Sequence, residues 1–148
     1  MNTNKRMTLR DFLINANPIS LDFCCLGRVI VGVYFISHGN GLFDVKAMLE
    51  LADYFSNDLH FPLPLLMAYL RTGAELFGGV MLVAGLYTRV GAFLILFTML
   101  VATFTALKGD LTGKAELTVV YALFCFVIIL VGSGKYSLDN YLFNKERN

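Results

Sequence analysis

Ionisable side chains inside long apolar stretches are the feature that most constrains this chain. Arg28 and His38 fall in one stretch, and Arg71 and Glu75 fall in the next. Each stretch approaches the ~20 residues that a helix needs to cross the hydrocarbon core of a bilayer. Charged groups at that depth cost a few kcal/mol each, so they usually face a bundle interior and pair with one another. The sequence therefore predicts a membrane protein with a polar interior.

Four apolar stretches organise the 148 residues, of which 57% are hydrophobic and 16% are charged. The alternating pattern of an outer-membrane barrel is absent, which leaves a helical bundle as the architecture that satisfies its own backbone in lipid. We predict an all-α membrane protein with a four-transmembrane-helix bundle over residues 21–134. The predicted spans are 21–43, 63–86, 90–107 and 117–132.

The distribution of Lys and Arg between the connections predicts the orientation. Seven lie before the first span, in the second connection or after the fourth span: Lys5, Arg6, Arg10, Arg89, Lys135, Lys145 and Arg147. Three lie on the opposite side: Lys46, Lys108 and Lys114. Because basic residues near span ends are retained in the cytoplasm, we expect segment 1–20 and tail 135–148 to be cytoplasmic. In a bacterial host the protein would then be a multi-pass protein of the inner membrane.

Two short helices are expected to lie along the membrane surface. Residues 8–16 carry a capping pair, Thr8 and Asp11, with apolar residues at helical spacing behind it, and Pro18 would end that helix. Asn15, Asn17 and Pro18 interrupt the apolar run, which argues against a cleaved signal peptide. The first outer loop, 44–62, predicts a second helix with apolar residues on the bundle and acids in water.

Three of the polar residues share one predicted depth. At 1.5 Å per residue, Glu75 lies near the bilayer centre, with Arg71 about 6 Å and His38 about 7 Å toward the outer side. Arg71 and Glu75 are four residues apart and therefore lie on one helix face, where an ion pair offsets part of their desolvation. Glu116 is expected near the outer mouth of the fourth span. These four residues are the predicted ligand site.

Structural interpretations of the same residues stay open. The Arg71–Glu75 pair is equally suited to locking two helices together, and Glu116 is explained by a solvated helix start. Arg28 lies about 7 Å toward the cytoplasm, near enough for its side chain to reach the surface. Arg28, Arg89 and Asp139 are therefore predicted to be structural polar residues, with Asp139 pairing with one of the two arginines.

The three cysteines give no redox or metal motif. Cys24 and Cys25 are neighbours and Cys125 lies in the fourth span, so neither a CxxC pair nor a Cys/His ligand spacing is present. We expect buried thiols, no metal site and no nucleic-acid partner.

An ordered set of short motifs resembles the DoxX family of small four-helix bacterial membrane proteins. The set comprises Arg28 with Gly32, "SHG" around His38, "AELFGG" at 74–79, "GLYTRVGA" at 85–92, Phe104 with Thr105, Glu116, and "GSGKYSLD" at 132–139. The resemblance implies association with quinol oxidase, with quinone-linked thiosulfate oxidation or with membrane complexes that handle thiols and oxidative stress. It implies a quinone as ligand, and other membrane redox subunits or a second copy of the chain as partners.

Three functions remain in competition. The first is an accessory subunit of a quinone-linked or thiol-handling redox complex, in which His38 would exchange protons near neutral pH while Arg71 and Glu75 orient it. The second is a non-catalytic scaffold or assembly subunit, favoured by the absence of cofactor motifs. A small transporter is third, because Arg28 and Glu75 have no counterparts in the second half.

Overall fold

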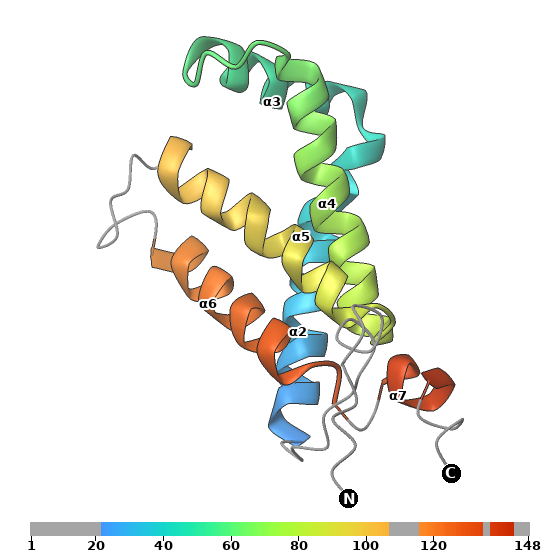
Figure 1. Ribbon diagram of the computed structural model, residues 1–148. Coiled ribbons are helices and arrows are strands. Elements are labelled where there is room, and N and C mark those ends of the chain that lie inside the picture. The colour runs from blue at the N-terminus through green and yellow to red at the C-terminus, as the bar shows by residue number, and fades with distance from the viewer. Residues whose placement is uncertain (1–21, 107–115, 135–136, 144–148) are drawn as a thin grey trace, which may run out of the picture.

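The computed structural model describes residues 22–106, 116–134 and 137–143, and every regular element in these ranges is helical. The elements, shown in Figure 1, are α2 (Asp22–Gly39), η1 (Asn40–Phe43), α3 (Val45–Asn57), α4 (Pro64–Ala84), α5 (Thr88–Val101), η2 (Ala102–Ala106), α6 (Glu116–Val131) and α7 (Leu138–Phe143). The interfacial helix predicted at 8–16 lies outside the described residues.

The four long helices coincide with the four predicted spans, with small shifts at their ends. The first helix ends at Gly39 rather than at 43 because the chain tightens there into the 3-10 helix η1. Two described segments, Pro64–Ala84 and Thr88–Thr105, are long and apolar enough to cross a membrane, and α6 is a shorter apolar helix. The described chain is thus all-helical with membrane-type helices.

Glycines allow α4 to approach a neighbour on each of two faces. A Cβ on Gly79 would lie 2.8 Å from the Gly32 carbonyl oxygen and 2.9 Å from the Ile36 amide nitrogen, both on α2. On the next face, a Cβ on Gly78 would lie 2.9 Å from the Gly91 carbonyl oxygen on α5. Because membrane helices associate mainly through close packing, these two faces make α4 the central helix, between α2 and α5.

Two apolar clusters fill the interior. The larger joins α2, α4, α5 and α6 through Val31, Phe35, Leu82, Ala92, Ile95, Met99, Ala122, Cys125 and Ile128. The smaller seats α3 on α4 through Met48, Ala52, Phe55 and Ala68. The predicted outer helix is therefore present, and it lies across one end of the bundle, away from α7 (Figure 1).

The helix ends follow from local chemistry. The first-turn proline Pro64 starts α4, where a missing N–H costs nothing, and Gly85 ends it with φ 66, a left-handed conformation that suits glycine. After α6, Gly132 and Gly134 adopt φ 90 and 76. The chain then turns back, and the Asp139 amide donates to the Gly85 carbonyl at 2.9 Å. This hydrogen bond fixes α7 against the α4–α5 turn.

Candidate functional site

An ion pair on α4 lies at the centre of the candidate site. The Arg71 Nε donates to Glu75 Oε1 at 3.1 Å, as the four-residue spacing predicts. The Glu75 side chain is 4% exposed, whereas that of Arg71 is 36% exposed. The Glu75 carboxylate is thus buried and accepts a hydrogen bond from Nε of Arg71. The two Nη groups of Arg71 carry its remaining N–H donors.

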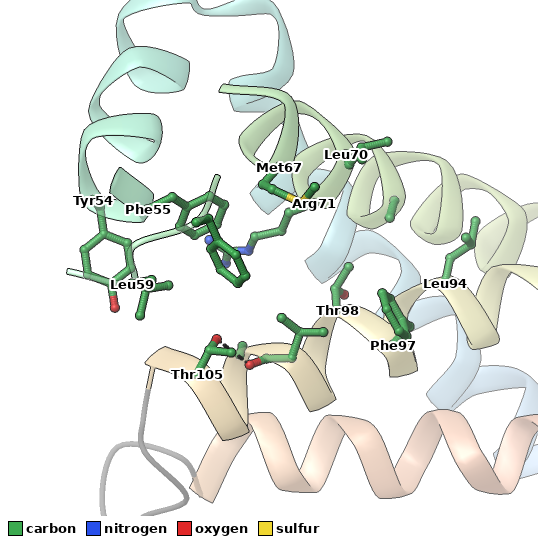
Figure 2. Close-up of a pocket in the computed structure, with 14 residues that line it drawn as sticks. Tyr54, Phe55, Leu59, Met67, Leu70, Arg71, Leu94, Phe97, Thr98 and Thr105 are labelled. Carbon is green, nitrogen blue, oxygen red and sulfur yellow. Dashed lines mark hydrogen bonds between the residues drawn. The ribbon is translucent and has the colours of Figure 1, made fainter. Parts of the chain in front are cut away.

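A cavity of about 360 Å³ lies beside this arginine, between the end of α3, the first half of α4 and the last turns of α5 (Figure 2). Its lining residues are Tyr54, Phe55, Leu59, Phe61, Met67, Leu70, Arg71, Ala74, Leu94, Phe97, Thr98, Val101, Ala102 and Thr105. Of these described residues, Arg71 alone is charged. A mostly apolar cavity with a few convergent polar groups is typical of small-molecule sites, whose volumes are about 300–1,000 Å³.

The two threonines in the wall, Thr98 and Thr105, have no hydroxyl donor left for a ligand. The Thr98 hydroxyl donates to the Ile95 carbonyl at 2.8 Å, and the Thr105 hydroxyl donates to the Val101 carbonyl at 2.6 Å. Their donors are satisfied within α5, so the guanidinium of Arg71 is the strongest hydrogen-bond donor that the cavity wall offers. A ligand head placed there would need acceptor oxygens.

The wall formed by α5 departs from regular helix at the cavity. Residues Ala102–Ala106 form the π-helical segment η2, which supplies Ala102 and Thr105 to the wall. Widened turns of this kind occur frequently at functional sites. The Thr103 hydroxyl lies 3.0 Å from that of Thr118, which ties this widened turn to α6.

His38 lies on a different surface from the predicted layer. It is exposed and does not line the cavity. Its ring lies 4.2 Å from the ring of Tyr34, which in turn stacks on Tyr121 of α6 at 4.8 Å. Its Nδ1 lies 3.2 Å from the Tyr34 carbonyl oxygen. The expectation that His38 shares an interior layer with Arg71 and Glu75 is therefore corrected: equal depth along a bundle does not fix the direction in which a side chain points.

Glu116 is the exposed first residue of α6 and is also absent from the cavity wall. A carboxylate in the first turn interacts favourably with the positive end of the helix dipole. Of the four residues predicted for the ligand site, the structure brings together Arg71 and Glu75.

A second buried polar cluster lies at the opposite end of the bundle, beside α7 (Figure 1). Asp139 is 2% exposed, and its carboxylate accepts from the amides of Tyr87 at 2.7 Å and Thr88 at 3.1 Å, which caps the start of α5. The same carboxylate interacts electrostatically with both Arg28 and Arg89.

Arg28 belongs to this cluster and is buried rather than extended to the surface. Its guanidinium fills the space where a Gly85 side chain would otherwise lie. Arg89 is also buried, as the second residue of α5 rather than in the connection before it. The snorkelling interpretation of Arg28 is therefore wrong, because the folded-back α7 brings a carboxylate to it.

Sequence reasoning missed the α5 wall of the cavity. Thr98 and Thr105 are seven residues apart in an apolar stretch and thus share a helix face, and this spacing was the available signal. The aromatic residues contributed by α3 and its following loop had no comparable signal. Among the described residues, no three His, Cys, Asp or Glu side chains are grouped to hold a metal ion.

Together, the membrane-type helices and the apolar cavity beside a partly buried ion pair define a small helical membrane protein with a ligand-sized site. A family model described as DoxX matches residues 23–108, and the chain belongs to the DoxX family. It is 34% identical over 122 residues to a Bacillus subtilis (strain 168) protein named "Putative oxidoreductase CatD", covering 82% of this chain and 87% of that protein.

A second relative, an uncharacterised protein of Haemophilus influenzae, is 28% identical over 139 residues, covering 83% of this chain and 92% of that protein. No solved structure matches the chain.

Proposed function

We propose that the chain is a four-span subunit of a membrane redox complex, located in the bacterial cytoplasmic membrane with both termini on the cytoplasmic side. Four apolar helices and the positive-inside distribution of Lys and Arg support this arrangement. The start of α2 and the whole of α7 also lie at the same end of the bundle (Figure 1). The oxidoreductase name of the Bacillus relative supports the redox assignment.

The ligand proposed for the cavity is a quinone. The observation that carries this proposal is the single charged donor, Arg71, in an otherwise mostly apolar wall. A quinone head has carbonyl oxygens that accept hydrogen bonds and an apolar ring and tail. The wall residues Leu70 and Phe97 are more than half exposed, and we place them on the lipid side. The donor set and the opening therefore fit such a molecule.

The roles of the chain's own residues follow from their positions. Arg71 donates through its Nη groups to a carbonyl oxygen of the quinone. Glu75 keeps the guanidinium oriented and balances its positive charge. The aromatic residues of α3 and its loop exclude water from the head. When bound, the quinone supplies reversible electron and proton uptake to the complex. His38 and Glu116 are outside this site.

Removing both members of the ion pair tests the site without leaving an unpaired buried charge. The double variant Arg71→Leu/Glu75→Leu should keep most of its stability, because apolar residues of similar volume often replace a buried pair at little cost. Its affinity for a short-tailed ubiquinone analogue in nanodiscs should fall by roughly tenfold or more, because a charged hydrogen bond contributes about 1.5–3 kcal/mol. Equilibrium binding and denaturant unfolding measure the two quantities.

His38→Gln and Glu116→Gln are the matched controls, and both should bind the analogue as the parent does. Unchanged binding by the double variant would remove Arg71 from the proposal.

Glu75→Gln separates the competing functions in the native membrane. A redox subunit should lose quinone-dependent turnover while still inserting, whereas a scaffold should lose only its co-purifying partners.

A further inference from the structure

The helix α3 has three distinct sides, and only one of them is covered by the bundle. Successive residues are about 100° apart, so Met48, Ala52 and Phe55 form one row, and these are the buried residues of the helix. About half a turn away lie Lys46, Glu50, Asp53 and Asn57, all exposed. The buried row faces the bundle and the polar row faces away from it.

A third row lies between these two and is exposed, and it is apolar except for Ser56 near the end of the helix. Val45 and Leu49 are about a quarter-turn from the buried row, and they are 64% and 50% exposed. Phe43, the last residue of the preceding 3-10 helix, is 80% exposed. Tyr54, which lines the cavity, lies on the other flank of the helix, so this apolar flank points away from the ligand site.

The position of α3 in the chain determines what covers this flank. α2 is followed directly by η1, and Asp44 is the one residue between η1 and α3. The flank therefore begins close to the end of a membrane-type helix. The Asp44 side chain accepts from the Lys46 amide at 2.9 Å and starts α3 there, which fixes the direction of the turn. A helix lying across the end of a spanning bundle has its sides at the level of the lipid headgroups and upper acyl chains.

We propose that α3 is an interfacial helix whose apolar flank, formed by Phe43, Val45 and Leu49, inserts into the boundary between headgroups and acyl chains of the surrounding bilayer. The polar row then lies in water and the buried row rests on α4. The partner proposed for this surface is lipid, since the flank is apolar and exposed and begins close to the end of a membrane-type helix, whereas the charged residues of α3 lie in a separate row. This function of α3 is independent of the ligand in the cavity.

The absence of tryptophan from the chain makes a direct test possible, because each substituted protein carries a single tryptophan, which can be excited selectively over the seven tyrosines. Val45→Trp and Leu49→Trp report on the flank, and Glu50→Trp, on the polar row of the same helix and at least about 100° from both, is the matched control. The three variants are reconstituted in phosphatidylcholine nanodiscs, in which both membrane faces are accessible. All three positions are exposed, so the substitutions should leave packing intact.

Quenching by acyl-brominated phosphatidylcholine should be at least about twofold greater for the two flank variants than for Glu50→Trp, with iodide showing the reverse order. Iodide quenching of all three variants to the same extent would overturn the proposal, because α3 would then stand clear of the lipid. Protection of the flank variants from both quenchers would also overturn it, because protein rather than lipid would cover the flank. Phe43→Trp gives an independent third reading on the same surface.

Discussion

Replacing Asp139 with alanine is expected to destabilise the protein by about 3–5 kcal/mol, because the change removes the negative member of a buried charged cluster. The carboxylate caps α5 through two amides and interacts with two buried guanidinium groups. Asp139→Ala leaves the amides of Tyr87 and Thr88 without this acceptor. The free energy of unfolding in detergent micelles, followed by circular dichroism during denaturant titration, measures the loss.

Three further variants define the cause. Leu138→Ala, at an exposed neighbour in α7, should change the unfolding free energy little. Asp139→Asn keeps one acceptor oxygen and loses the charge, so it should be intermediate. Adding Arg89→Met to Asp139→Ala should cost less than the sum of the two single changes, because each removes a partner of the other. Equal free energies of unfolding for Asp139→Ala and Leu138→Ala would show that the Asp139 carboxylate does not stabilise the fold.

The two polar sites divide the bundle into ends with different properties. Around Asp139, the carboxylate, two arginines and two backbone amides are buried together, and such a cluster favours one fixed geometry. Around Arg71, the guanidinium is partly exposed in a cavity, and the adjoining end of α5 is π-helical. The Asp139 cluster joins α7 to the α4–α5 turn, and the cavity lies at the other end of the bundle.

The parts predicted from the sequence are those fixed by local chemistry. The second span was predicted at 63–86, and α4 runs from Pro64 to Ala84, because proline tolerates the first turn and glycine adopts the left-handed φ that ends a helix. The Arg71–Glu75 pair follows from helical spacing alone. Asp139 was predicted to pair with one of the two arginines, and its carboxylate interacts with both.

The direction in which side chains point around each helix axis was the main feature that could not be predicted from the sequence. Phe35 is buried and His38, three residues later, is exposed, although both lie on the same side of an idealised helix. Depth along the bundle is set by residue count, but facing is set by the crossing of helices, here at Gly32 and Gly79. The cavity was equally hidden, since it depends on how α4 and α5 diverge and on the π-helical turn.

Gly79→Ala is expected to destabilise the contact between α2 and α4, whereas Gly73→Ala on the same helix should be neutral or stabilising. The new methyl at 79 would press on backbone atoms of Gly32 and Ile36, which cannot move unless the whole helix moves. Overpacking of this kind costs about 1–3 kcal/mol. At 73 nothing lies within 4 Å of the added Cβ.

The comparison is sharp because both changes remove a glycine from the interior of α4. Each gains the same intrinsic helix preference, about 0.5–1 kcal/mol for alanine over glycine, so the difference between them isolates the helix contact. Denaturant unfolding in the same micelles should lower the midpoint for Gly79→Ala and leave it unchanged or raise it for Gly73→Ala. Parallel shifts would mean that α2 and α4 do not meet at Gly79, and the central position of α4 in the bundle would have to be abandoned.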